Sequence, residues 1–498
     1  MKNLYLTTAI ALLASPVLAD ISPADLWQSW QEDFANLGVT LSAEPEQQGN
    51  VLVLRNVKWA AEFGFFNIDE TIAEMRFTAL PDGSVAVDYS TTLTIDMSID
   101  GAKGVTVELN GTGALENAHG TITGTLNDYV LEFSIGRMTQ SGEMSGQTNG
   151  APFSNGTMDM VITEMTGREH VVHGDTGVSL TYDFTMGGLE NAQVTKSNLG
   201  SDLTSEDTSS TKGQGYVGSI AAFFPTPVEG SQGGSLIPQG LLLDFSLQVE
   251  STHSEQSSES PFSKMNMVAD EGLQRLALNV DEQSVSLQGS DQSVSIEVTS
   301  SEFGSTPLGG TFDSGEIRIS LPLRPLATPQ DASFALSLSG VTANDAVWAL
   351  ADPAGSLSHG PADFAIDTRA SIDLLLDWTD FEAAKNLNSA PAILHSIKLQ
   401  DFLIAIENTR LTGVGVVEFS NDGPAPEPNG GMINFTLDGV NALLDKLGTL
   451  PLVDPSLTAG AKGMLGMFTA SSGGPDSLKS VIEFSEGGHV SINGQQVR

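Results

Sequence analysis

The residues of this chain that could carry out chemistry are few, and the nearest approach to a metal site is a cluster around residue 170. Glu169, His170, His173 and Asp175 are all potential ligands. A strong zinc signature instead places two histidines four residues apart on one face of a helix. In a strand, three-residue spacing sends His170 and His173 to opposite faces. We therefore interpret these residues as polar turn or edge positions, and the sequence predicts no metal ion and no cofactor.

Motifs for nucleophilic catalysis and for phosphate or calcium binding are also missing from the sequence. Neither G-x-S-x-G nor a phosphate loop that ends in Gly-Lys-Ser/Thr occurs. Ser209 and Lys212 have S-x-x-K spacing, but they lie in a polar, low-complexity stretch that is not expected to form a rigid site. The nearest approach to a calcium loop is Asp96, Asp100 and Gly101, where the acids are four residues apart in an expected strand. The sequence therefore assigns no catalytic residue, and it favours a non-enzymatic role without deciding the point.

The charge of the chain excludes one class of partner. The 498 residues contain 62 acids against 21 Lys and Arg, which gives a net charge of −41. Affinity for nucleic acid depends on Lys and Arg, so we expect no nucleic-acid binding. The acids are dispersed along the chain, as on a solvated surface. With so many carboxylates some pair will face each other, so a carboxylate-pair hydrolase stays open as an alternative.

The first nineteen residues have the pattern of a cleavable signal peptide. Lys2 supplies the charge, an apolar stretch follows up to Leu18, and Val17 and Ala19 are the small residues expected before the cut. Cleavage is expected between Ala19 and Asp20. The mature protein is then expected in the periplasm, with no transmembrane segment after cleavage and, because the sequence contains no cysteine, no disulfide.

The clearest helix is expected directly after this cleavage site. Ser22 can cap it, Pro23 suits its first turn and Gly38 can end it. An apolar stripe at three-and-four spacing lies between them: Leu26, Trp27, Trp30, Phe34 and Leu37. Such a stripe is typical of a helix packed on a sheet. Further helices are expected near residue 342 and over 439–468, where a row of glycines (Gly460, Gly463 and Gly466) indicates close packing on a neighbour.

From residue 50 onward the apolar period changes to two, which is typical of strands. The best examples run from Ser84 to Asp100 and from Asp363 to Leu376. At about 3.3 Å per residue the first would span about 55 Å, so it must curve, bulge or break. The expected fold class is mainly β with a few helices (α+β). Long antiparallel sheets have one apolar and one wet face, and short helices pack on the dry face.

Polar stretches at residues 198–215, 251–260 and 421–431 are expected to be linkers or long loops, and the first is the expected domain boundary. The predicted organisation begins with the signal peptide over 1–19. A β-rich domain with a leading helix follows over 20–200, then a linker or loop over 201–235. A β-rich region over 236–498 ends in helices and a final hairpin.

Several short segments together resemble a known family. They are Ser22-Pro-Ala-Asp-Leu-Trp27 with Trp30, Leu37-Gly-Val-Thr-Leu41, Asp82-Gly-Ser-Val85, Phe223-Phe-Pro-Thr-Pro227 and the region from Gly413 to Leu447. In this order they resemble an uncharacterised group of exported alphaproteobacterial proteins, domain of unknown function twenty-one twenty-five. The C-terminal strand–strand–Gly–helix arrangement is also similar to AsmA-type and YdgA-type envelope proteins, which build long β-sheet grooves. The closer resemblance implies export and a β-rich fold, and it carries over no site residues.

Two functional hypotheses follow. The favoured one is a non-enzymatic periplasmic protein that has an envelope structural role or binds an apolar ligand such as a lipid. The predicted ligand contacts lie on the apolar strand faces: Val85, Tyr89, Leu93, Ile95, Met97, Phe364, Ile366, Ile372 and Leu374. The same side chains could instead form a closed core. The alternative is a secreted polysaccharide hydrolase with a carboxylate pair. A cleft lined by aliphatic residues favours the first hypothesis, and carboxylates with aromatic platforms favour the second.

Overall fold

The computed structural model describes residues 21–36, 38–63, 66–100, 104–149, 151–200, 203–226, 240–379, 390–421, 423 and 425–498. The expected signal peptide lies outside these residues, as do Leu37 and, within the expected 201–235 linker, residues 201–202 and 227–235. Strands make up 70% of the structure and helices 11%, which confirms a mainly β fold with a few helices.

The elements up to residue 225 are one helix and long or paired short strands: α1 (Pro23–Asn36), β1 (Val39–Gln48), β2 (Val51–Phe63), β3 (Phe66–Ala79), β4 (Val85–Tyr89), β5 (Thr92–Asp100), β6 (Val105–Glu116), β7 (His119–Thr125), β8 (Asp128–Thr148), β9 (Ala151–Gly174), β10 (Gly177–Gly200) and β11 (Leu203–Pro225).

The remaining elements are the strands and helices of the C-terminal part: β12 (Leu242–Val249), β13 (Ser251–Glu259), β14 (Lys264–Glu271), β15 (Gln274–Val280), β16 (Ser284–Ser300), β17 (Gly304–Pro322), β18 (Gln330–Ala343), α2 (Asp345–Ala351), β19 (Ala362–Leu374), β20 (Ala392–Ile406), β21 (Thr409–Ser420), β22 (Glu427–Asp438), α4 (Val440–Leu447), α5 (Pro455–Phe468), β23 (Ala470–Ser471), β24 (Ser477–Ser485), η2 (Glu486–Gly488), β25 (His489–Ile492) and β26 (Gln495–Gln496).

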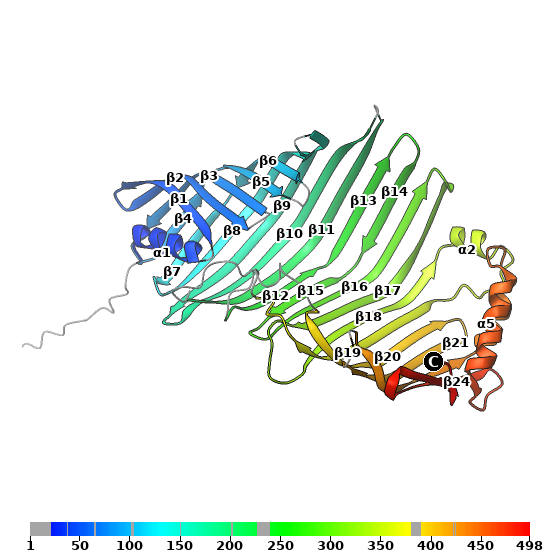
Figure 1. The fold of residues 1–498 in the computed structure, drawn as a ribbon. Coiled ribbons are helices and arrows are strands. Elements are labelled where there is room, and N and C mark those ends of the chain that lie inside the picture. Colours follow the sequence, from blue (N-terminus) through cyan, green and yellow to red (C-terminus); the bar gives the residue numbers. More distant parts are fainter. Residues whose placement is uncertain are drawn as a thin grey trace, which may run out of the picture.

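All of these strands belong to one antiparallel sheet, in which most strands pair with the next one along the chain (Figure 1). The long strands β8 to β11 form its middle. On either side, two short strands take the place of one long strand. Thus β8 pairs with both β6 and β7, and β11 pairs with both β12 and β13. Hydrogen bonding therefore continues across residue 200, where the domain boundary is expected.

The segment expected as one strand from Ser84 to Asp100 is divided at Ser90 and Thr91 into β4 and β5. This confirms that so long a strand must curve, bulge or break. Both halves pair with β3, and the Ser90 amide donates a hydrogen bond to the Glu74 carbonyl at 2.8 Å. The break therefore separates two ladders without separating the strands from the sheet.

Two stretches expected to be linkers or loops are strands instead. Residues 203–225 form β11 and residues 251–259 form β13, and these strands pair from Glu206 with Glu259 to Gln214 with Ser251. The loop expectation is wrong there because both faces of residues 203–215 and 251–259 are polar. Ser and Thr suit an extended backbone, while hydrophobic alternation, the signal used to find strands, is missing.

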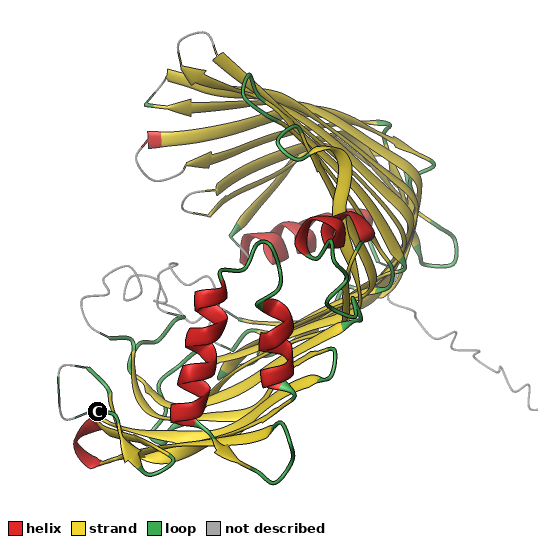
Figure 2. Ribbon diagram, turned by 90° about the vertical axis from the view of Figure 1, so that its right-hand side faces the viewer, coloured by secondary structure: helices red, strands yellow, loops and turns green. Residues whose placement is uncertain are grey.

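The N-terminal helix packs on the sheet as its apolar stripe predicts. Leu26 and Trp27 of α1 are buried in a core with Leu54, Phe77 and Ile122 from the sheet. Trp30 meets Phe77 edge-on with ring centroids 5.3 Å apart. Figure 2 shows the sheet curved, with the helices on its inner side. The inner side is therefore the dry face on which the helices are expected to pack.

The C-terminal helices α4 and α5 lie over the other end of the sheet (Figure 2). Ser480 Oγ donates a hydrogen bond to the Phe468 carbonyl at 2.8 Å, which ties the end of α5 to β24. A Cβ atom added at Gly460, Gly463 or Gly466 would meet no described atom within 4 Å. The expected close packing of this glycine row on a neighbour is therefore wrong within the described chain. None of the described helices is both long and apolar enough to cross a membrane.

Candidate functional site

The candidate site is a surface that crosses the strands. Directly paired residues of an antiparallel sheet point to the same face, so the strand register identifies side chains that share a face. One line of paired positions, which we call the central row, crosses seventeen strands from β2 to β22. It consists of Leu52, Phe77, Val87, Gly120, Phe133, Gly167, Phe184, Gly218, Leu247, Leu276, Gly289, Ile317, Leu336, Ile366, Phe402, Gly413 and Phe435.

Every position of the central row is apolar or glycine. Sixteen steps of about 4.8 Å make it roughly 77 Å long along the sheet. A second row, two residues away on the same face, is almost as apolar. It consists of Val85, Ile122, Leu131, Glu169, Tyr182, Ile220, Phe245, Leu278, Leu287, Ile319, Phe334, Thr368, Leu399, Gly415, Ile433 and Ile482.

A third row lies on the other side of the central row, in the C-terminal part of the sheet. It consists of Val249, Gln274, Asp291, Gly315, Leu338, Phe364, Ile404, Leu411, Leu437 and Leu478. These three rows define what we call the apolar face. Their only carboxylates are Glu169 and Asp291.

Aromatic rings close the spaces that the glycines leave in the central row. A Cβ atom on Gly218 would overlap the Phe184 ring, and one on Gly413 would overlap the Phe435 ring. Tyr182 stacks with Phe133 at 6.0 Å and with Phe184 at 5.3 Å between ring centroids. Each ring therefore lies over a neighbouring strand, and the face is a continuous apolar floor.

The helices α4 and α5 lie over the far end of the apolar face (Figure 2), and α1 covers its beginning. Beneath it Phe77, Val85 and Val87 are fully buried. Farther along, Leu276 is 39% exposed and Phe334 is 38% exposed. A pocket of about 440 Å³ opens in this region, lined by Leu247, Leu276, Ile317, Leu336 and Leu338 among others. A large apolar surface left open in this way is a candidate ligand site.

The predicted ligand contacts on β4 and β5 lie at the covered end. Val85, Leu93 and Ile95 are buried, while Tyr89 and Met97 are half-buried. Val85 and Leu93 belong to the core beneath α1, with Tyr89 packed against it. This arrangement corresponds to the closed-core alternative for these residues.

The predicted contacts on β19 lie at the other end of the sheet. Ile366 is in the central row and Phe364 is in the third row, where its ring meets Phe402 edge-on at 6.4 Å. Ile372 and Leu374 follow on the same side of β19, and only Leu374 is buried. The structure thus does not bring the two predicted groups together. The residues between them, Leu247 to Leu336, were missed because cross-strand register is not visible in the sequence.

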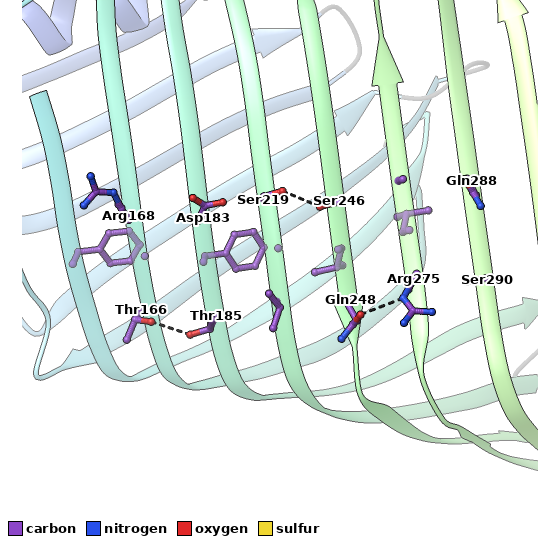
Figure 3. Close-up of a pocket in the computed structure, with 18 of the residues that line it drawn as sticks. Thr166, Arg168, Asp183, Thr185, Ser219, Ser246, Gln248, Arg275, Gln288 and Ser290 are labelled. Atoms are coloured by element: carbon purple, nitrogen blue, oxygen red, sulfur yellow. Dashed lines mark hydrogen bonds between the residues drawn. The ribbon is translucent and has the colours of Figure 1, made fainter. Parts of the chain in front are cut away.

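The opposite side of the sheet carries a polar groove of about 830 Å³ (Figure 3). Its walls are two polar cross-strand rows, and the backbone of the central row is its floor. Thr166 and Thr185 are hydrogen-bonded at 2.8 Å, as are Ser219 and Ser246 at 2.8 Å. Arg275 Nε donates a hydrogen bond to Gln248 Oε1 at 3.2 Å. These side chains satisfy one another, so the groove is the wet face that the alternation predicts.

The metal-like cluster is divided between the two faces. His170 Nε2 is 2.8 Å from Asp128 Oδ1, whereas His173 Nε2 is 3.0 Å from both oxygens of Asp33 on α1. This confirms that a strand sends the two imidazoles to opposite sides. In the part of the chain that the structure describes, no group of three or more His, Cys, Asp and Glu side chains could hold a metal ion.

Glu169 of this cluster lies on the apolar face at the edge of the cover made by α1. Burial raises the pKa of its carboxyl group, and the nearby Asp33 carboxylate adds to this effect. Burial, with a further contribution from the Glu169 charge, also raises the pKa of Tyr182 to about 12. The sequence contains a signal that could have placed Glu169 on this face, because Gly167, Glu169 and Val171 are two residues apart on β9 and therefore share one side of the strand.

Burial likewise raises the pKa of the carboxyl group of Asp291 in the third row. Its position borders the 440 Å³ pocket. Neither Glu169 nor Asp291 has a hydrogen-bond or ion-pair partner among the described residues. The arrangement can therefore hold an apolar chain on its floor and can present two acidic groups to it, of which Glu169 has the Asp33 carboxylate nearby.

Comparison with known proteins finds a family match for the C-terminal part of the chain. No curated protein matches the chain. Residues 246–492 match the family described as "Uncharacterized protein conserved in bacteria (DUF2125)". This region runs from β12 to β25 and includes the exposed position Leu276 of the central row together with the helices α4 and α5. Residues 246–492 are thus similar to this family of uncharacterised bacterial proteins, which agrees with the resemblance to domain of unknown function twenty-one twenty-five.

Proposed function

We propose that this protein is an exported envelope protein that binds an apolar ligand, such as the acyl chain of a lipid, on its apolar face. The single observation that carries the proposal is the unbroken central row, which continues past the cover of α1 into exposed positions such as Leu276. An acyl chain laid on such a floor gains about 0.8 kcal/mol for each buried CH₂. Periplasmic localisation and the likeness to groove-forming AsmA-type proteins are part of this proposal.

The alternative hydrolase needs two carboxylates close together. Glycosidases hold their carboxyl pair roughly 5–9.5 Å apart. Glu169 on β9 and Asp291 on β16 are separated by five strand spacings, roughly 24 Å. The two carboxylates of the three rows are therefore too far apart to act on one glycosidic bond. Asp33 of α1, the carboxylate near Glu169, is bound by His173. Both observations favour binding over hydrolysis.

The test compares an aspartate on the apolar face with one on the polar face. Leu276→Asp places a carboxylate on the exposed floor, and Val217→Asp places one on the polar side at a site that is 51% exposed. We expect Leu276→Asp to weaken binding of an uncharged fluorescent apolar dye at the site around Leu276 by at least about tenfold, because the charge must be desolvated against the ligand. Val217→Asp should bind the dye like the wild type.

Both variants should remain folded, because both sites are open to water. Leu93→Asp provides the contrast, since Leu93 is only 2% exposed; it should lower the free energy of unfolding by several kcal/mol. If wild-type protein fails to bind the dye, or if Val217→Asp weakens binding as much as Leu276→Asp, the proposed site is wrong.

A further inference from the structure

Resting on the proposed function, we propose that the pocket beside Asp291 selects amphiphiles whose head group is an ammonium or hydroxyl group, and that Asp291 is the group that binds this head. Asp291 lies on β16 in the same phase as Leu287 and Gly289, so its side chain points to the apolar face. The 440 Å³ pocket is lined by Asp291 together with Leu247, Leu276, Ile317 and Leu338.

The surroundings of Asp291 offer it no partner. Its direct neighbours in the third row are Gln274 and Gly315. The Gln274 amide donates hydrogen bonds to Thr252 Oγ1 at 2.8 Å and to Glu271. Gly315 has no side chain, and among the described residues the Asp291 carboxylate accepts no hydrogen bond. Arg275, which follows Gln274 in the sequence, also borders the pocket, but its Nε donates to Gln248, and it forms no ion pair with Asp291 among the described residues.

A half-buried carboxylate without a partner on an apolar wall is unfavourable for the empty protein. The same carboxylate stabilises a bound donor, because a charge-assisted hydrogen bond is stronger beside apolar groups than in water. A ligand whose chain lies on the floor from Leu276 to Leu336 and whose head group donates to Asp291 covers the apolar floor and gives the carboxylate a hydrogen-bond partner. A fatty-acid or phosphate head would be repelled by Asp291 and by the net charge of −41.

The experiment measures displacement of the uncharged dye at neutral pH by an alkylamine, an alcohol and a fatty acid of equal chain length. Wild-type protein should bind the amine and the alcohol more tightly than the fatty acid. Asp291→Asn should lose about tenfold or more in affinity for the amine and should bind the dye as before, because the floor is unchanged. Thermal melting of each variant checks that it is folded.

Two matched variants serve as controls. Asp183→Asn removes the same charge from the polar groove on the other face, and Glu169→Gln removes the second carboxylate of the apolar face. Both should keep the preference for the amine. If Asp291→Asn keeps it, or if Glu169→Gln loses it instead, the inference is overturned while the proposed function stands. If wild-type protein binds neither the dye nor any of the three amphiphiles, the proposed function fails as well.

Discussion

The face of the sheet that a side chain reaches depends on its place in the alternation along its strand, and one irregular residue can reverse this alternation. On β16, Leu287, Gly289 and Asp291 share the apolar face. Ser293 has a positive φ of 55°. The next residue, Val294, is buried, although an uninterrupted alternation would place it on the face opposite to Asp291. Asp291 therefore lies on the apolar face beside a local irregularity that alternation in the sequence does not reveal. The sequence neighbours of Glu169 likewise suggest a metal cluster. Its position in the sheet is visible only from the strand pairing, which places Glu169 on one face with Leu131 and Tyr182.

The raised pKa of Glu169 gives a prediction about stability and pH. An acid whose pKa is higher in the folded protein than in the unfolded chain stabilises the fold when it is protonated. This contribution is complete below the unfolded pKa of about 4.5 and is lost as pH rises through the folded pKa. Glu169→Gln removes the dependence. The variant should therefore exceed the wild type in free energy of unfolding at neutral pH, and the difference should shrink towards pH 4.

Urea denaturation of both proteins between pH 4 and pH 8 measures this difference. Glu143→Gln, which removes an exposed carboxylate from β8, controls for the loss of one negative charge from an acidic chain. A Glu169→Gln variant that is less stable than the wild type at pH 7 would mean that its surroundings stabilise the ionised carboxylate, whereas burial should penalise it.

At the scale of elements, the sequence predicts α1 well because local signals suffice. The cap, the first-turn proline and the apolar stripe all lie within sixteen residues, and the helix spans Pro23–Asn36. The long strand and its break were also predictable, because its length alone is incompatible with an ordinary strand. β13 and the first half of β11 were not predictable. Hydrogen bonds to neighbouring strands stabilise them, and their polar side chains carry no alternating pattern.

The glycines of α5 give a prediction at this scale. In a helix interior Gly is less stable than Ala by about 1 kcal/mol, and a methyl group at Gly460 or Gly463 would meet no described atom. Gly460→Ala and Gly463→Ala should each raise the free energy of unfolding by about 0.5–1 kcal/mol. Gly218→Ala provides the contrast, because its Cβ would overlap the Phe184 ring and should destabilise the protein. Destabilisation by the two α5 substitutions would show that a neighbour packs on the glycine row after all.

For the whole molecule, the sequence predicts the faces of the sheet but not their alignment. One-sided strands predict a dry and a wet face, and the structure has both. They do not predict that the dry positions of seventeen strands align into one row across the sheet, because each alignment depends on the register between two strands. The groove expected along a single strand in fact runs perpendicular to it. The predicted contacts Ile366 and Phe364 lie on the apolar face because the register of β19 with β18 and β20 aligns them with its rows.

Export gives a prediction for the whole chain. Val17 and Ala19 before Asp20 match the small residues that precede a cleavage site. Protein recovered from the periplasm of expressing cells should therefore begin at Asp20 by N-terminal sequencing. Recovery of chains that begin at Met1 in the membrane fraction would show that the segment is an anchor, and it would place the apolar face close to a bilayer.

The length of the apolar face predicts how many ligands it holds. From Phe184 to Ile366 the central row crosses seven strand spacings, roughly 34 Å. An acyl chain that fills one leaflet of a bilayer is about 15 Å long, half of the hydrocarbon thickness. Two chains can therefore lie end to end on this part of the row. Native mass spectrometry with saturating long-chain alcohol should show at least two ligands per protein, and Leu276→Asp should leave at least one bound near Ile366. Saturation at one ligand, lost completely in Leu276→Asp, would mean that the row acts as a single pocket around Leu276 and that the rest of the face is covered core.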